Sequence, residues 1–364
     1  MDSRKNILTD FAIDIPEGRE IRILQLTDIQ TIHLEGVRET PGDTRLYQVR
    51  GAFFSDEASH NDEIRAWRYV REGVSLAHPD LIVLTGDNIY GQTDDDGRQW
   101  TDFCTVLDSF GIPWAVVFGN HDNESGKGVS WQIEQVQKTK YGMISPGNIT
   151  GNCNYTVGIR QGGQYRTVLY MMDTNGCHVY DNPGEGMAAA NVDRDRIASA
   201  SGIHDDQLAW MKSSYRTITE SCKYQVPSMI FMHIPSAEFA DAVDVLYPGA
   251  RSEKRFVPDR AGDFGISYEK ATGFGNGGKF WNTAKEIGCT SIFAGHQHRI
   301  ATSIVYDGIR LTYGMKTGTY DYFHQDMLGS TLITLCDQET SPIVEYLHSR
   351  LEYVPVPGAW KDNG

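Results

Sequence analysis

Residue types that bind metals recur at the ends of five short apolar runs in this sequence. The runs are rich in β-branched residues and bounded by glycine or polar residues, which predicts buried strands. Each ends in a side chain that can coordinate a cation: Asp28 in IRILQLTDIQ, Asp87 in DLIVLTGDNIY, Asn120 in WAVVFGNHD, His233 in SMIFMHIP, and both His296 and His298 in SIFAGHQH. In open α/β sheets the ligand site lies beyond the carboxyl ends of the strands, so we expect these side chains to meet.

The donor types at these endings favour a pair of transition-metal ions. Carboxylate and amide oxygens mixed with imidazole nitrogens suit iron, manganese or zinc, whereas an all-oxygen set would suit calcium or magnesium. The donors outnumber the ligands of one tetrahedral ion, so two ions that share a bridging carboxylate account for them best. Two ions about 3.5–4 Å apart lower the pKa of a bound water and hold the oxygens of an in-line displacement, as in phosphatases.

Each ending also has an ordinary structural explanation. A histidine at a strand end can be a structural residue, Gly-Asn-His-Asp can be only a turn, and Gly-Asp-Asn-Ile-Tyr can be a capped strand end. An explanation of this kind would have to hold at all five strand ends of one chain together, so we favour the metal site.

The segments between the endings predict the layers that position them. Apolar residues occur at helical spacing in 61–78, 100–111, 204–218 and 279–289, and each pattern lies between two predicted strands. Further runs at 165–174, 301–308, 309–314 and 330–335 add strands. We therefore expect an α/β fold, a four-layer α/β/β/α sandwich of two mixed sheets flanked by helices. We expect residues 1–364 to form a single domain, with irregular insertions near 31–61 and 247–278.

The composition limits the kinds of partner. The formal net charge is -15, the pI is near 5.1 and no Lys/Arg cluster occurs, so we expect no nucleic-acid partner. No stretch of about 18 apolar residues occurs, so we expect no membrane span, and the N-terminus lacks the apolar region of a signal peptide. The sequence as it stands indicates a cytoplasmic protein, or a secreted or periplasmic one if a leader was removed. It carries no signal of an oligomeric state.

The endings, taken in order, resemble the signature of a known family. The set D-I-Q, G-D-N-I-Y, G-N-H-D, I-F-M-H and G-H-Q-H spans residues 28–298 and resembles the calcineurin-like metallophosphoesterases and, within them, the purple acid phosphatases. Most members of the family begin the set with Asp-x-His, and Gln30 departs from that pattern. Purple acid phosphatases instead supply a tyrosine from Gly-Asp-x-x-Tyr, which corresponds to Tyr90. The short segment before Asp28 makes the sequence similar to a subgroup without a separate N-terminal sandwich domain.

This resemblance implies the ligands of each ion. One ion would be held by Asp28, Asp87, Tyr90 and His298, and the other by Asp87, Asn120, His233 and His296. A phenolate ligand suits a ferric ion, so the resemblance implies Fe(III) at the first position with Fe, Zn or Mn at the second. Gln30 would either hydrogen-bond to a ligand or to the bridging water, or be an ordinary neighbour.

The resemblance also implies catalytic roles and an activity. His121 would lie beside the phosphate and donate a proton or hydrogen bond toward the leaving oxygen, held in place and protonated by a carboxylate, for which we expect Asp122. A metal-bound hydroxide would be the nucleophile. The predicted activity is hydrolysis of phosphate esters of small molecules or proteins, and we favour a phosphomonoesterase. The alternatives are a phosphodiesterase acting on nucleotides or lipid headgroups, and a catalytically silent metal-binding protein.

The residues that contact the substrate are marked less clearly. Asn123 directly follows the Gly-Asn-His-Asp segment, and several donor groups follow the last histidines. Each of these side chains can equally belong to the surface or the core. The candidate substrate-binding residues are Asn123, Arg299, Lys316, Tyr320 and His324.

Overall fold

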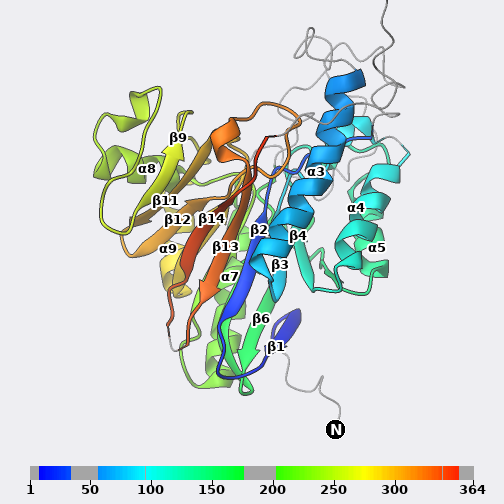
Figure 1. Ribbon diagram of the computed structural model, residues 1–364. Coiled ribbons are helices and arrows are strands. Elements are labelled where there is room, and N and C mark those ends of the chain that lie inside the picture. Colours follow the sequence, from blue (N-terminus) through cyan, green and yellow to red (C-terminus); the bar gives the residue numbers. More distant parts are fainter. Residues whose placement is uncertain (1–7, 34–55, 95, 176–201, 338, 352–364) are drawn as a thin grey trace, which may run out of the picture.

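The computed structural model describes residues 8–33, 56–94, 96–175, 202–337 and 339–351. Within these residues the chain forms two β-sheets packed face to face, with helices on both outer faces (Figure 1). This confirms the predicted α/β/β/α arrangement of two mixed sheets. All five strands that were predicted to end in metal ligands are present.

The six-stranded sheet carries three of those five strands. Its order is β14 (Ile343–His348), β13 (Gly329–Leu335), β2 (Ile21–Leu26), β3 (Leu81–Thr85), β4 (Trp114–Val117) and β5 (Gly142–Met143). Strands β2 to β5 are parallel, whereas β13 is antiparallel to both β2 and β14. Because β2, β3 and β4 are parallel neighbours, Asp28, Asp87 and Asn120 follow them at the same edge of the sheet.

The eight-stranded sheet carries the other two. Its order is β1 (Phe11–Ile15), β6 (Tyr155–Gln161), β7 (Gln164–Met171), β8 (Ser228–Phe231), β10 (Cys289–Ala294), β12 (Ile309–Tyr313), β11 (Ile300–Tyr306) and β9 (Phe264–Ser267). Strands β8 and β10 are parallel neighbours. The three candidate histidine ligands therefore also follow neighbouring carboxyl ends.

Helices cover the outer face of each sheet. On the six-stranded sheet, α3 (Asp56–Ala77) packs on β2 and β13, while α4 (Arg98–Ser109) and α5 (Val129–Lys138) pack beside β5. On the eight-stranded sheet, α7 (Asp205–Cys222), α8 (Ala237–Leu246) and α9 (Lys279–Glu286) pack against β7, β11 and β10 respectively. Short 3-10 helices occur at Gly91–Thr93, Asp122–Glu124, Ala250–Ser252 and Gln325–Met327.

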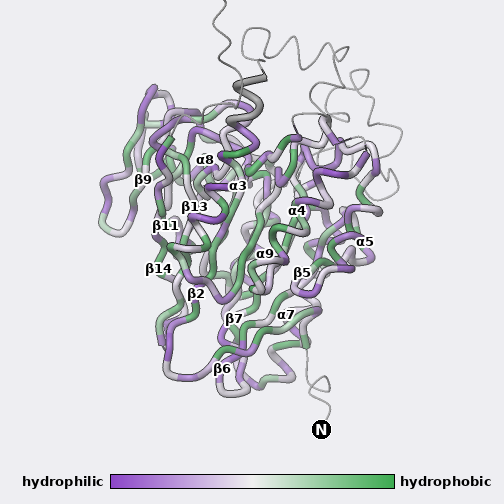
Figure 2. Tube along the Cα trace, turned by 45° about the vertical axis from the view of Figure 1, so that its right-hand side comes forward, coloured by the Kyte–Doolittle hydropathy of each residue, from purple (hydrophilic) through white to green (hydrophobic). Residues whose placement is uncertain are grey.

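Strand side chains alternate between faces, so the strands of the eight-stranded sheet contribute to two large core clusters. In β8, Met229 and Phe231 belong to the core between the sheets, whereas Ile230 belongs to the core under α7, α8 and α9. Phe231 stacks on Phe293 of β10 at 4.8 Å between ring centroids. The apolar segments accordingly run through the strands in Figure 2. This packing fixes the strand ends that position the site.

The two predicted insertions are described only in part. Residues 34–55 lie outside the described residues, and α3 begins at Asp56. The segment 247–278 contains a 3-10 turn and strand β9, which pairs with β11 at the edge of the eight-stranded sheet. The single-domain organisation stays a prediction.

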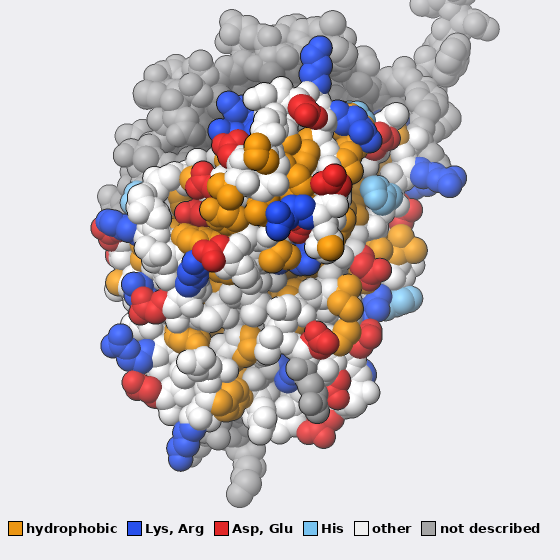
Figure 3. All heavy atoms as spheres, turned by 90° about the vertical axis from the view of Figure 1, so that its left-hand side faces the viewer, with side chains coloured by type: hydrophobic (Ala, Val, Ile, Leu, Met, Phe, Trp, Pro, Cys, Tyr) orange, Lys and Arg blue, Asp and Glu red, His pale blue; other side chains and the backbone are white. Residues whose placement is uncertain are grey.

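The surface and helices of the described part of the chain carry two further observations. None of its helices is both long enough and apolar enough to cross a membrane. On the face that includes α8 and β9, basic and acidic side chains of the described residues are interspersed (Figure 3). The negative charge is therefore not gathered into one area on this face.

Candidate metal centre

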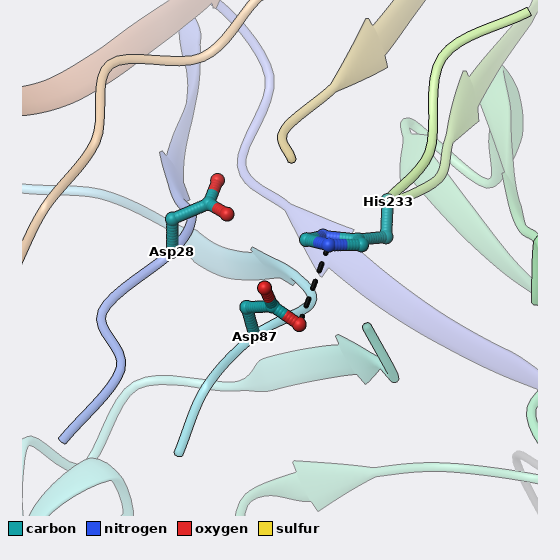
Figure 4. A group of neighbouring side chains, drawn as sticks. All are labelled: Asp28, Asp87 and His233. Atoms are coloured by element: carbon teal, nitrogen blue, oxygen red, sulfur yellow. Dashed lines mark ion pairs between the residues drawn. The ribbon is translucent and has the colours of Figure 1, made fainter. Parts of the chain in front are cut away.

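Three buried side chains converge where the two sheets meet at their carboxyl edge. Asp28 follows β2, Asp87 follows β3 and His233 follows β8, and one ligand atom of each lies within 4.8 Å of the others. Figure 4 shows the three side chains pointing toward one another from separate strands. Two carboxylates and an imidazole at this spacing are a donor set for a cation.

A second set of donor atoms surrounds Asn120. Its Oδ1 lies 3.1 Å from His233 Nε2 and 3.0 Å from His296 Nδ1, and His233 Nε2 lies 3.3 Å from Asp87 Oδ1. These four residues are the set that the sequence resemblance assigns to the second ion. The structure brings all four together.

The remaining donors gather at Asp28. Its Oδ1 lies 3.1 Å from His298 Nε2. His298 Nδ1 lies 2.9 Å from the Tyr322 carbonyl, and His233 Nδ1 lies 2.8 Å from the Thr85 carbonyl. A backbone acceptor on Nδ1 orients the ring so that Nε2 faces the centre, as is common for metal-binding histidines.

The backbone at the site is held in an uncommon conformation. Four non-glycine residues have positive φ: Asp28 at 49°, Gln30 at 44°, Asp87 at 49° and His296 at 73°. Such angles are costly for these residues and cluster at functional sites. The surrounding hydrogen bonds retain them, including those from the Asp28 amide to the Gly86 carbonyl and from the Gln30 amide to the Asp87 carbonyl.

Two glycines of the motifs are required by close packing at the carboxylates. A Cβ on Gly119 would overlap the Asp87 carboxylate and backbone nitrogen, and a Cβ on Gly295 would overlap the side chains of Thr27 and Asp28. These contacts explain the glycines that precede Asn120 and His296.

Gly119→Ala should therefore displace Asp87 and destabilise the fold by about 1–3 kcal/mol, since the added methyl has no free volume to occupy. Urea unfolding of the metal-free protein measures the loss. Gly275→Ala is the matched control, because a Cβ there meets no atom within 4 Å. Equal stability of the two variants would contradict this explanation of Gly119.

The protonation of Asp28, Asp87 and His296 suits a cation. Burial raises the pKa of Asp28, but the hydrogen bond from His298 and the charges of His298 and His233 outweigh it and lower the pKa to about 2. Burial also raises the pKa of Asp87, but the charges of His233 and His121 outweigh this effect. The pKa of Asp87 therefore falls well below its ordinary value. Burial and the charge of His233 lower the pKa of His296 to about 4. Ionised carboxylates and a neutral imidazole are the forms that bind metals. Burial lowers the pKa of His233, but the charge of Asp87 outweighs it and raises the pKa to about 9, so His233 would release a proton when an ion binds.

His121 lies directly beside this donor set. Its backbone amide donates to Asp87 Oδ1 at 2.9 Å, and its Nδ1 lies 2.8 Å from Glu124 Oε2. Burial lowers the pKa of His121, but the charges of Glu124 and Asp87 outweigh that effect and raise it to about 10. In the metal-free protein the ring is therefore an imidazolium at neutral pH.

The expected role of Asp122 is wrong in the structure. Its carboxylate accepts hydrogen bonds from the backbone amides of Gly119, Asn88 and Ile89, at 2.7–3.0 Å, and so ties the loop after β4 to the loop after β3. Burial and the charge of Asp87 raise the pKa of Asp122 to about 7. Glu124 contacts His121 because residues 122–124 form a 3-10 turn, which places residue i+3 over residue i. In the sequence, the only indication of this contact is that Glu124 lies three residues after His121.

Tyr90 lies next to His121. The two rings stack with centroids 4.6 Å apart, and Tyr320 packs edge-on against Tyr90 at 4.8 Å. Tyr90 is buried in a small cluster with Ile32 and Tyr320. The assignment of its hydroxyl as a metal ligand stays a prediction.

The candidate substrate-binding residues occupy different environments. Asn123 is buried and donates to the Gly119 carbonyl at 3.3 Å, and Lys316 and Tyr320 are buried as well. Arg299 is exposed and lies over the Tyr322 ring at 5.3 Å. His324 stacks on Tyr268 at 3.8 Å. Arg299 and His324 thus remain the members of this set that can meet a substrate at the surface.

The sequence comparisons place the chain in a family. A family profile described as calcineurin-like phosphoesterase matches residues 21–299, and the chain belongs to that family. The matched range contains every candidate metal ligand and ends one residue after His298.

Individual relatives are distant. An uncharacterized protein of Schizosaccharomyces pombe is 25% identical over 234 residues, which are 64% of this chain and 40% of that protein. A protein of Arabidopsis thaliana named "Probable inactive purple acid phosphatase 14" is 22% identical over 279 residues, 73% of this chain and 65% of that protein. The chain thus spans less than two thirds of the length of either relative. A solved dimetal phosphatase from Danio rerio aligns over 90% of this chain and 98% of its own, with 12% identity and a TM-score of 0.43.

Proposed function

We propose that the protein is a hydrolase of phosphate esters, and specifically a phosphomonoesterase, that works with two metal ions. The observation that carries this proposal is the pair of donor groups that share Asp87, with a charged His121 at their side. An imidazolium next to the ligands repels a bound cation, so it is not expected at a metal site with a purely structural role. The family of the chain supports phosphate esters, of small molecules or of proteins, as the substrates.

We assign the candidate ligands to two ions. Asp28, Asp87, His298 and Tyr90 would hold the first ion, and Asp87, Asn120, His233 and His296 would hold the second. Tyrosine among the donors favours Fe(III) at the first position, with Fe, Zn or Mn at the second. When bound, such ions supply an acidified water and a clamp on phosphate oxygens.

His121 would act on the leaving group. Its Nδ1 faces Glu124, so Nε2 is the ring nitrogen that would donate to a substrate. The imidazolium can donate from Nε2 to the leaving oxygen as the bond to phosphorus breaks, which is general-acid assistance. Asp87 fixes the backbone at His121 through the amide hydrogen bond, so metal ligation and proton donation share one rigid loop.

Two alternatives are separated by substrate choice. The name of the Arabidopsis relative includes the word inactive, which makes a silent metal-binding protein a specific rival, and a phosphodiesterase would use the same donors. The expected result is hydrolysis of p-nitrophenyl phosphate at a higher kcat/KM than its bis ester. Faster cleavage of the bis ester would favour a phosphodiesterase, and bound metal with no cleavage of either would favour the silent protein.

Removing the ions should abolish this activity without unfolding the protein. The two sheets pack through a continuous apolar core, so the fold does not depend on the ions. We expect hydrolysis to disappear after dialysis against a chelator and to return on addition of Fe, Mn or Zn. Elemental analysis and far-UV circular dichroism of the same samples check the two halves of the prediction. Full activity in metal-free protein would contradict it.

A further inference from the structure

A buried lysine lies behind the first donor group. Lys316 is 2% exposed and follows β12, in a segment that pairs with Thr27 and Leu328 through isolated bridges. Its Nζ donates to the Asp28 carbonyl at 3.0 Å and to Gln30 Oε1 at 2.7 Å. A cation is therefore built into the wall next to residues that would bind another cation.

The lysine determines which atom Gln30 presents to the site. An ammonium is only a donor, so the amide oxygen of Gln30 must face it, and the amide nitrogen faces the other way. Gln30 Nε2 accordingly donates to Asp87 Oδ2 at 3.3 Å. An amide NH₂ cannot coordinate a cation, and the oxygen that could do so is already bound to Lys316. Gln30 is thus held as a support for Asp87 and kept out of the ligand set.

We propose that Lys316 is a positioning residue that weakens the binding of a divalent ion at the first position relative to the same ion at the second. It does so by holding the Gln30 oxygen away from the ion and by placing a fixed positive charge behind Asp28. The inference rests on the proposed two-ion centre. When both positions hold the same divalent ion, the one beside Asp28 and His298 would then bind it more weakly.

The test is calorimetric titration of the metal-free protein with Mn²⁺. The wild-type protein should bind two ions with unequal dissociation constants. Lys316→Met should tighten the weaker event by about tenfold or more, because a like charge is removed at short range and the Gln30 oxygen is released. The tighter event should change by no more than about twofold, because Lys316 contacts the Asp28 side of the centre and only Asp87 is common to the two ligand sets. A lysine with a purely structural role would give the opposite result, weaker binding in the variant.

Three further variants resolve the cause. His298→Ala should remove the weaker event, which assigns it to the first ion. Lys316→Met combined with Gln30→Met should lose part of the gain, because no amide oxygen remains to be released. Lys285→Met is the matched control: it removes the same charge from an ammonium that is paired with Asp307 at the surface, and it should leave both events unchanged.

The outcomes decide separately on this inference and on the proposed function. Two ions bound by the wild type, with unchanged or weaker binding in Lys316→Met, would overturn the inference alone. A wild-type protein that binds no Mn²⁺ would overturn the two-ion centre and this inference with it. If Lys316→Met does not fold by circular dichroism, Lys316→Gln takes its place, since it keeps a neutral donor near Gln30. That variant should still tighten the weaker event through loss of charge, and unchanged binding would overturn the inference.

Discussion

Asp87→Asn should lose both metal ions and the hydrolytic activity together. Asp87 lies between the two donor groups, and its charge is what raises the pKa of His233 to about 9 against the opposing effect of burial. Substitutions of residues that only support metal ligands cost about 10–100-fold in affinity, and loss of a shared ligand should exceed that range. Calorimetric titration with Mn²⁺ and kcat/KM for p-nitrophenyl phosphate measure the two effects.

Asparagine is the informative replacement at this position. Asp87 has a φ of 49°, which asparagine tolerates better than alanine, and the amide oxygen can still accept from the His121 backbone amide. The control is Asp94→Asn, a second buried acidic residue whose carboxylate accepts from the amides of Gln99 and Trp100. It should retain metal and activity. Two ions bound by Asp87→Asn with wild-type affinity would refute the bridging assignment.

The sequence was sufficient for the parts of the site that follow directly from strand ends. Runs such as LIVLT are apolar and β-branched, which is typical of buried strands. The polar residue that ends each run must then lie at the carboxyl edge of the sheet. The donors Asp28, Asp87, Asn120, His233, His296 and His298 met for that reason. Parallel pairing of β2, β3 and β4 then fixed their order.

Other features depend on packing that a sequence pattern does not encode. Strand β6 was not predicted, because Gly158 and Arg160 interrupt its apolar pattern, yet it pairs along its length with β7. Lys316 is 286 positions from Gln30, and no local pattern indicates that an ammonium will be buried there. The choice between Asp122 and Glu124 depended on the rotation of a single 3-10 turn.

The side-chain environments in the loop after β12 also depend on packing that the sequence pattern does not encode. Lys316, Tyr320 and His324 of this loop are candidate substrate-binding residues in the sequence, but Lys316 and Tyr320 are buried in the structure. The Tyr322 carbonyl lies within hydrogen-bond distance of His298 Nδ1, and the Tyr322 ring stacks on the His298 ring. The Thr317 amide donates to the Thr27 carbonyl. Residues 316–322 of the loop therefore support the Asp28 side of the centre.

His121→Ala should retain both ions and lose about 10²–10⁴-fold in kcat, the range of general acid–base assistance. The side chain of His121 is outside the two donor groups, and its backbone amide donates to the Asp87 carboxylate. Metal content by elemental analysis and kcat for an unactivated alkyl phosphate measure the two quantities. The alkyl ester is the sensitive substrate, because its leaving oxygen needs a proton more than p-nitrophenolate does. Loss of metal equal to that of Asp87→Asn would contradict this role.

Glu124→Gln tests how the charge on His121 is maintained. Bound cations would offset the charge of Asp87, so Glu124 is the partner that keeps the imidazolium protonated in the working enzyme. Neutralising Glu124 removes a stabilising charge, so the pKa of His121 falls from its raised value. Because the protonated ring is the active form, the alkaline decline of kcat should move to lower pH, while the rate at acidic pH is retained. Glu134→Gln, the same change at an exposed position of α5, should leave the profile in place. An unshifted profile in Glu124→Gln would mean that His121 does not donate the proton, since its ionisation would then have no bearing on the rate.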